Sequence, residues 1–178
     1  MQATNTKIYG HSSYIGTTGY NNHTRDFFRE LSKIYEFKVR NFTVPVEWGG
    51  LEDEPFNEEY YLNDIDKKLL TTQTLIHSDP PLELVDHDIY SNYPNDFNHN
   101  LNIVLAEVNH HYFYQQYIGP KIAYTVWETT RYPKDFYNIL NTFDQVWVPS
   151  KWQRECSIEQ GMDPNKVKVV PEAVDGDT

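Results

Sequence analysis

The sequence predicts an α/β fold: a Rossmann-like, three-layer arrangement in which a parallel β-sheet carries helices on both faces. Short apolar segments of strand length alternate along the chain with segments whose apolar residues recur at helical spacing. This alternation is typical of a buried parallel sheet, because the helices that connect parallel strands cover both of its faces. At 178 residues the chain is long enough for one such domain, so we treat residues 1–178 as a single unit.

The first elements are expected to be a strand, a glycine-containing loop, a helix and a second strand. We expect the first strand over residues 7–14, followed by the loop IGTTGYNN at 15–22. Polar side chains at 22–24 are suited to cap the helix. Alternating residues over 37–46 predict the second strand, which ends at Pro45. The apolar residues at helical spacing are Phe27, Phe28, Leu31, Ile34 and Tyr35.

The middle of the chain, residues 47–100, gives the weakest pattern. It is rich in turn-forming residues, acids and tyrosines, so we expect only a short helix near 58–71 with loops or small hairpins around it. An apolar run at 102–108 predicts the next strand, and the segment that follows it looks helical up to Gly119.

The next elements follow a more regular alternation. We expect buried strands at 121–128 and 145–150. The helix between them starts at Pro133, because the first turn of a helix accepts proline. Its apolar residues stand at i, i+3, i+4 and i+7, and they are Phe136, Ile139, Leu140 and Phe143.

One more helix and one more strand complete the series. Ser150 with Gln153 three residues later has the pattern of a capping box, so a helix should begin there. Gly161 suits the left-handed position just past its end. The apolar run at 166–172 predicts the last strand.

Composition narrows the classes of partner. Asp and Glu outnumber Lys and Arg by 26 to 15, and no basic run could follow a phosphate backbone, which argues against nucleic acid. No stretch reaches the roughly 20 apolar residues that cross a bilayer, and the N-terminus lacks a signal-like apolar core. The single cysteine, Cys156, forms no internal disulfide. We therefore expect a cytoplasmic protein without a transmembrane segment, whose many aromatic rings suit carbohydrate.

Polar residues follow the predicted strands directly. Ligands of a doubly wound sheet bind beyond the carboxyl ends of its strands, where loops lead into helices. Side chains placed there line a crevice, whereas the same groups inside the sheet would have to be buried. The candidates in such positions are Glu128, Thr129 and Arg131 after one strand, Lys151 after the next, and His11 near the end of the first.

The loop after the first strand is a second candidate feature. Glycines let a backbone approach a ligand closely, and the helix that follows offers free N–H groups to an anion. The loop is neither a GxGxxG nor a Walker sequence, so a plain tight turn and a diphosphate site both stay open. Its candidate residues are Gly16, Thr17, Thr18 and Gly19, with Tyr20 and Asn22 just beyond them.

Several motifs occur in one order in the last third of the chain. A W-E-T-x-R-x-P strand end spans 127–133, D-x-V-W-V-P-S-x-W spans 144–152, a helix ends in glycine, and V-V-P-E-x-V-D spans 169–175. This run resembles the acceptor-domain signature of GT-B fold glycosyltransferases of the large family four of retaining enzymes. The resemblance covers about half of the chain by motif; the glycine loop fits it more loosely, and residues 45–100 do not match it.

The resemblance implies transfer of a sugar from a nucleotide-sugar donor to an acceptor hydroxyl, with retention and without a metal or other cofactor. Glu128 falls where many relatives carry an active-site histidine, and a carboxylate there is suited to stabilise positive charge at the anomeric carbon. The glycine loop would approach the donor diphosphate. Acceptor binding is expected from His11, Tyr20, Asn22, Thr129, Arg131 and Lys151.

One departure from the family concerns the donor site. In the family a second domain holds most of the nucleotide-sugar, with paired glutamates in E-x7-E spacing. This sequence stops at Thr178, where the hinge between domains is expected. We therefore expect residues 1–178 to be the N-terminal acceptor half, which needs a C-terminal nucleotide-sugar domain for turnover.

Other readings of these residues stay open. Glu128 is also suited to a structural role, either capping the helix that begins at Pro133 or pairing with Arg131. Asp86 and Asp88 form a D-x-D tripeptide, which in GT-A glycosyltransferases holds a divalent cation. A non-catalytic glycan-binding module is a further alternative. A dinucleotide oxidoreductase is disfavoured because GxGxxG is missing.

Overall fold

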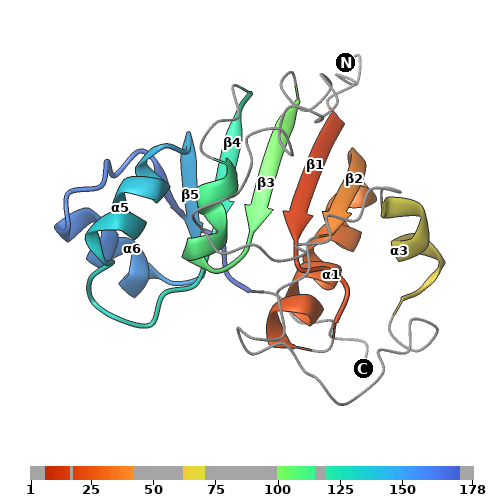
Figure 1. Ribbon diagram of the computed structural model, residues 1–178, viewed down its shortest axis with the longest axis horizontal. Coiled ribbons are helices and arrows are strands. Elements are labelled where there is room, and N and C mark those ends of the chain that lie inside the picture. The colour runs from red at the N-terminus through yellow and green to blue at the C-terminus, as the bar shows by residue number, and fades with distance from the viewer. Residues whose placement is uncertain (1–6, 17, 42–61, 71–99, 115–118, 173–178) are drawn as a thin grey trace, which may run out of the picture.

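A computed structural model describes residues 7–16, 18–41, 62–70, 100–114 and 119–172, and the structural statements below refer to these residues. Six strands form one sheet in the order β2-β1-β3-β4-β5-β6, and all neighbouring pairs are parallel (Figure 1). The predicted α/β class with a parallel sheet is therefore confirmed. The strands are β1 (Lys7–Ser12), β2 (Glu36–Asn41), β3 (Leu101–Leu105), β4 (Lys121–Tyr124), β5 (Gln145–Val148) and β6 (Val167–Val169).

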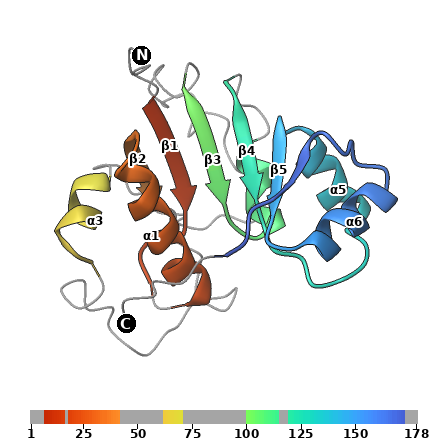
Figure 2. The same ribbon diagram turned by 180° about the vertical axis from the view of Figure 1, so that it is seen from behind.

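Helices cover both faces of the sheet, as the alternating pattern predicts (Figures 1 and 2). One face carries α1 (Gly19–Ser32) and α3 (Asp64–Leu69). The other carries η3, a 3₁₀ helix over Val108–Tyr114, with α5 (Lys134–Asn141) and α6 (Lys151–Glu159). No helix in the described part of the chain is long and apolar enough to span a bilayer.

Successive residues of the central strands point into two separate cores, one under each layer of helices. This follows from the two-residue period of a strand, which sends neighbouring side chains to opposite faces. The core beneath α1 includes Ile103, Leu105, Ile122 and Tyr124, and the core beneath α5 includes Val104, Ala123, Val146 and Val148.

Several strands end earlier than their apolar runs predict. β1 stops at Ser12 rather than residue 14, and β4 stops at Tyr124 rather than residue 128. The apolar residues beyond each end pack from loops: Tyr14 is buried against Phe28, and the half-buried Trp127 stacks on Tyr132. The extra apolar residues therefore belong to the loops that leave the sheet.

The ends of α1 also differ from the sequence-based expectation. The helix begins at Gly19, with Thr18 as its N-cap in a capping box with Asn21, so the expected caps at 22–24 lie inside it. It ends at Ser32, and Ile34 and Tyr35 are 73% and 45% exposed rather than part of its buried face. Asn22 and Thr24 are also good N-cap residues, so residue type alone does not select Thr18 as the cap.

The helices of the last third follow the sequence signals closely. The Ser150 hydroxyl accepts a hydrogen bond from the backbone N–H of Gln153 at the start of α6, which confirms Ser150 as the cap. The predicted capping box is only half formed, because the side chain of Gln153 binds Thr125 and Tyr132 instead of returning to Ser150. Gly161 adopts a φ of +108° just past the end of this helix, as expected for a left-handed glycine. Pro133 is the N-cap of α5 and not its first helical residue.

Gly10 sets the distance between α1 and the sheet. A Cβ atom at this position would lie 2.5 Å from a ring carbon of Phe28 on α1 and 2.8 Å from a ring carbon of Phe37 on β2. Only a residue without a side chain allows both rings to rest on β1 this closely.

The strand order fixes where a ligand crevice is expected. From β1 the chain passes to β2 on one side, and β3 lies on the other side of β1. This change of direction is the topological switch point of a doubly wound sheet, and ligands bind beyond the carboxyl ends of the strands at that point.

Candidate functional site at the carboxyl edge of the sheet

All of the predicted site loops begin at one edge of the sheet, because the strands are parallel and end on the same side (Figure 1). The loop after β1 carries the glycines, and the loop after β4 carries Glu128 and Arg131. Lys151 is the first residue of α6, which begins shortly after β5. The structure thus brings these segments to a common edge, as the strand-end argument predicts.

The switch point itself is closed by buried hydroxyl groups. The Ser12 hydroxyl at the end of β1 donates a hydrogen bond of 2.6 Å to the carbonyl oxygen of Leu105 at the end of β3. The same hydroxyl lies 2.8 Å from the hydroxyl of Thr24 on α1. A ligand that binds at this edge would therefore have to lie beyond this contact, among the loops.

Side chains from neighbouring elements already bind the backbone of the glycine loop. The side-chain oxygen of Asn41, at the end of β2, accepts hydrogen bonds from the N–H groups of Tyr14 and Ile15 at 2.8 and 2.9 Å. The side-chain oxygen of Asn21 accepts from the N–H of Thr18 at 2.8 Å. These three N–H groups are consequently not available to a diphosphate.

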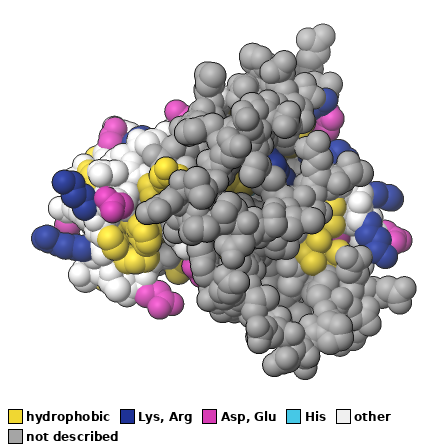
Figure 3. Space-filling model, in the orientation of Figure 1, with side chains coloured by type: hydrophobic (Ala, Val, Ile, Leu, Met, Phe, Trp, Pro, Cys, Tyr) yellow, Lys and Arg dark blue, Asp and Glu magenta, His cyan; other side chains and the backbone are white. Residues whose placement is uncertain are grey.

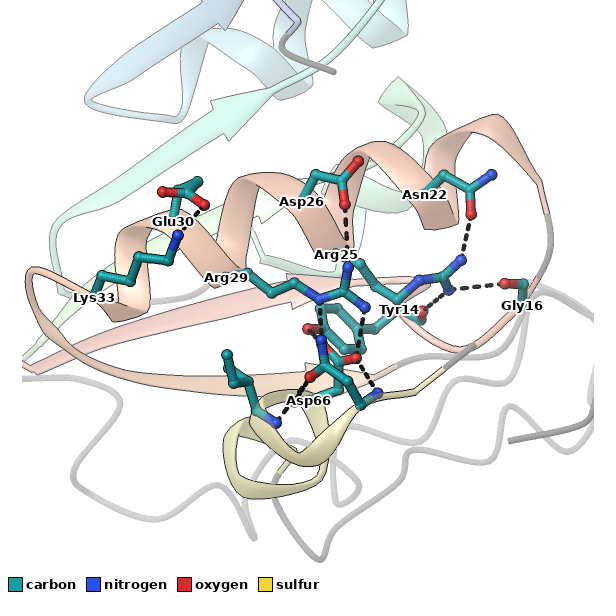
Figure 4. Close-up of polar contacts among 11 residues, drawn as sticks. Tyr14, Gly16, Asn22, Arg25, Asp26, Arg29, Glu30, Lys33 and Asp66 are labelled. Atoms are coloured by element: carbon teal, nitrogen blue, oxygen red, sulfur yellow. Dashed lines mark hydrogen bonds and ion pairs between the residues drawn. The ribbon is translucent and has the colours of Figure 1, made fainter. Parts of the chain in front are cut away.

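Arg25 holds the other side of the same loop (Figure 4). Its guanidinium donates hydrogen bonds of 2.8 Å to the carbonyl oxygens of Tyr14 and Gly16, and another to the side chain of Asn22. Burial lowers the pKa of Arg25 below its usual value. The side-chain oxygen of Asn22, an expected acceptor contact, is therefore already used within the protein.

Two N–H groups remain for an anion near this loop. Among the described residues, no hydrogen bond is made by the N–H of Gly19 or of Tyr20, which open the first turn of α1. Thr18 is occupied as the helix cap, and Thr17 lies outside the described residues. The expected diphosphate contact stays a prediction, limited to the start of α1 and the backbone of Gly16.

The ion pair between Asp66 and Arg29 also holds the loop after β1, through Tyr14. Asp66 on α3 accepts two hydrogen bonds from Arg29, at 2.8 and 2.6 Å, and one of 2.5 Å from the phenol of Tyr14 (Figure 4). Burial acts to raise the pKa of Asp66, but the hydrogen bonds from Arg29, Tyr14 and the backbone of Asn63 outweigh it and hold that pKa below its usual value.

Asp64 and Asp66 form another D-x-D tripeptide in the sequence, and this ion pair decides whether it can hold a cation. Both carboxylate oxygens of Asp66 are occupied, so the pair Asp64 and Asp66 is not arranged to hold a cation. The described residues contain no cluster of three or more potential metal ligands. Asp86 and Asp88, the candidates of the metal-dependent alternative, lie outside the described residues.

The loop after β4 is a compact turn closed by aromatic packing. The Trp127 ring stacks on Tyr132 with centroids 5.5 Å apart and meets the edge of Phe136 at the same distance. The indole N–H of Trp127 and the hydroxyl of Thr129 both donate hydrogen bonds of 3.0 Å to the carbonyl oxygen of Arg131. These contacts leave the residues at the tip of the turn facing solvent.

Glu128 lies at this exposed tip. Its carboxylate makes no hydrogen bond or ion pair with any described residue, so it neither pairs with Arg131 nor caps α5, whose N-cap is Pro133 without a side-chain bond. The two structural roles considered for Glu128 are therefore not observed. Arg131 and Lys151 are likewise exposed and make no side-chain hydrogen bond among the described residues.

Tyr20 connects the start of α1 to the loop after β4. Burial raises the pKa of Tyr20 to about 12, while hydrogen bonds with the Val126 backbone and the Thr125 side chain act in the opposite direction. The glycine loop and the Glu128 loop therefore adjoin at Tyr20.

Two acidic residues near Tyr20 are absent from the sequence-based candidates. The charges of Glu107, after β3, and of Glu172, after β6, both act to raise the pKa of the Tyr20 phenol, which places them close to it. Each follows a short apolar strand within a few residues. The same strand-end signal that selected Glu128 would have selected both of them.

His11 is enclosed by the fold rather than exposed at the edge. Its Nε2 lies 3.0 Å from the side-chain oxygen of Asn102, and its ring packs against Tyr114 with centroids 4.8 Å apart. Burial lowers the pKa of His11 from 6.5 to about 3. A ligand would reach this side chain only after the surrounding packing opens, so its expected role in acceptor binding stays a prediction.

Charges of neither sign dominate the surface over α5 and α6. On the face drawn in Figure 3, basic and acidic side chains are interspersed over this part of the molecule, with hydrophobic groups between them. Electrostatic attraction therefore does not single out this described area as a binding surface.

Comparison of the sequence with models of known protein families gives no match, and comparison with curated proteins gives none either.

Proposed function

We propose that this chain is the acceptor-binding domain of a retaining, metal-independent glycosyltransferase that moves a sugar from a nucleotide-sugar donor to an acceptor hydroxyl. The observation that supports this best is the loop after β4, which exposes the Glu128 carboxylate to solvent and gives it no hydrogen bond or ion pair with any described residue. A carboxylate kept free at a strand end is suited to stabilise positive charge that develops on a reacting sugar. The motif W-E-T-x-R-x-P around it supports the same reading.

The other edge residues fit subsidiary roles in this reaction. Arg131, Thr129 and Lys151 would bind acceptor hydroxyls or acidic groups, because Thr129 and Arg131 share the loop of Glu128 and Lys151 begins α6 at the same edge of the sheet. The free N–H groups of Gly19 and Tyr20 would approach the donor diphosphate. A second, C-terminal domain would hold the nucleotide. A cytoplasmic location belongs to the same proposal.

The test is a transfer and donor-hydrolysis screen over common nucleotide-sugars, run on the protein together with its proposed nucleotide-sugar domain, with and without EDTA. Transfer that persists in EDTA, with retained anomeric configuration, supports the proposal. Activity that EDTA abolishes would favour the metal-dependent alternative with Asp86 and Asp88. Glycan binding without hydrolysis or transfer of any donor would contradict an enzymatic role and favour a binding module.

A further inference from the structure

We infer that Gln153 and Gln160 of α6 are positioning residues for the loop that presents Glu128 and Arg131. This inference rests on the proposed function. Together these two side chains hold the two ends of the loop, at Thr125 and at Tyr132. They would act on the reaction through Glu128, without touching a substrate themselves.

Gln160 fixes the point where the loop returns to the fold. Its side-chain oxygen accepts a hydrogen bond of 2.8 Å from the N–H of Tyr132, and its side-chain nitrogen donates one of 2.8 Å to the carbonyl oxygen of the same residue. Two bonds from one planar amide to one residue fix both the position and the direction of the backbone there.

Gln153 ties the beginning of the loop to its end. This buried side chain donates hydrogen bonds of 3.3 Å to the carbonyl oxygen of Thr125 and 2.9 Å to the hydroxyl of Tyr132. Ser157, one turn further along α6, also donates to the Tyr132 hydroxyl, at 3.3 Å. Residues 126–131 therefore lie between two anchored residues, Thr125 and Tyr132.

Anchoring of this kind matters because a reacting group must be held close to its productive position. The stack of Trp127 on Tyr132 fills the inside of the turn, so the anchored ends and the packed interior together restrict the tip. Replacing a residue that holds a functional group in its productive position therefore lowers the reaction rate strongly, even when that residue does not touch the substrate.

The competing explanation is that the glutamines simply attach α6 to the rest of the fold. Arg154 supplies the matched control, because its guanidinium donates hydrogen bonds to the carbonyl oxygens of Val167 at 3.1 Å and Pro164 at 3.2 Å. Gln160→Met and Arg154→Met thus each remove two hydrogen bonds between α6 and backbone carbonyl or N–H groups. Only the first change releases the loop that carries Glu128.

The experiment compares these two variants by steady-state transfer kinetics and by hydrogen exchange in the protein with its proposed second domain. Gln160→Met should lower kcat by about a hundredfold, the order of loss that a misplacement of about 1 Å causes, with a smaller change in the donor KM. The amide of Tyr132 should exchange faster in this variant. Arg154→Met should leave both kcat and that amide unchanged.

The possible outcomes separate the two proposals. Equal kinetic effects in the two variants, or unchanged exchange at Tyr132 in Gln160→Met, would overturn the positioning role while the wild-type transfer activity stands. An inactive wild-type protein would instead overturn the proposed function and, with it, the inference. If Gln160→Met does not fold, Tyr132→Phe tests the Gln153 anchor through kcat alone, because it removes the hydroxyl bound by Gln153 and Ser157 and keeps the bonds of the Tyr132 backbone to Gln160. A kcat equal to that of Arg154→Met would overturn the positioning role.

Discussion

Asp66 illustrates at the residue scale how strongly one buried charge depends on its partners. Its side chain is completely buried, and Arg29 and Tyr14 supply its hydrogen bonds from α1 and from the loop after β1. A carboxylate removed from water is stable only when it is paired and hydrogen-bonded in this way. Asp66 thereby joins α3 to the base of the candidate site.

Asp66→Asn should destabilise the fold substantially. The change leaves Arg29 without its buried partner, and breaking such a pair costs about 3 kcal/mol, the lower end of the usual range because Arg29 is partly exposed. Urea unfolding measures this loss. Asp26→Asn is the control, since the Arg29–Asp26 pair has side chains that are 22% and 30% exposed. The control should lose less than about 1 kcal/mol, and equal losses would refute the assignment.

Glu128→Gln should separate catalysis from stability. The amide keeps the shape of the side chain but removes its charge, so kcat for sugar transfer should fall by about a hundredfold or more if the carboxylate stabilises the transition state. The free energy of unfolding should change by less than about 0.5 kcal/mol, because the exposed carboxylate makes no hydrogen bond or ion pair with any described residue.

Glu155→Gln on the exposed side of α6 is the matched control for Glu128→Gln, and it should leave turnover unchanged. The control tests whether the loss of any exposed negative charge slows the reaction. Full turnover in Glu128→Gln would contradict a catalytic role, and a lower melting temperature together with an unchanged kcat would assign Glu128 a structural role.

The sequence located single residues well only where the signal is local. The cap at Ser150 and the left-handed Gly161 were predicted correctly, because each depends on residues within one or two turns. The cap of α1 was placed wrongly, because Thr18 and the polar residues at 22–24 offer similar capping groups. Which of them caps the helix depends on how α1 packs against the sheet.

At the scale of elements, the packing of α1 on β1 gives a direct test of the fold. Gly10→Ala would push a methyl group into the rings of Phe28 and Phe37, and overpacking of this kind costs about 1–3 kcal/mol. Thermal or urea unfolding measures the loss. Gly19→Ala is the control, because the added carbon would have no described atom within 4 Å apart from its chain neighbours and the backbone of its own helix.

The control should stabilise the protein slightly, by less than about 1 kcal/mol, since alanine favours a helix over glycine. If Gly10→Ala were as harmless as Gly19→Ala, the close approach of α1 to β1 would be wrong. The sequence offered no sign of this contact, because the glycine and the rings that meet it come from three separate elements.

The order and type of the elements were predictable, but their ends were not. Apolar runs identified each strand of the sheet, and helical spacing of apolar residues identified α1 and α5. It overestimated β4 because Trp127 is apolar yet belongs to the loop, where it stacks on Tyr132. A pattern of apolar residues predicts which residues are buried, but it does not predict whether a strand or a loop buries them.

At the scale of the whole molecule, two buried histidines make stability depend on pH. Burial lowers the pKa of His11 to about 3 and that of His111 to about 4, against an ordinary value of 6.5. Below pH 6.5 the unfolded chain therefore binds protons that the folded protein does not bind. The stabilisation from the neutral rings is complete above that pH, and it is lost as the pH falls towards 4.

His111→Gln should make this loss less steep. Each such histidine contributes a slope of up to about 1.4 kcal/mol per pH unit, so the variant should lose that much of the slope between pH 6.5 and 4. Urea unfolding at several pH values measures it, and the slope between pH 7 and 8 serves as the internal control. An unchanged acid slope would show that His111 does not titrate as its burial requires.

The sequence alone determined that this protein has a parallel sheet with helices on both faces and that Glu128 follows a strand, because these features depend on local periodicity and turn residues. Only the tertiary structure decided which loops adjoin, that Gln153 and Gln160 hold the Glu128 loop, and that His11 is enclosed. These contacts join residues distant along the chain. They are set by the order of the strands and the packing of helices on them, which no local pattern encodes.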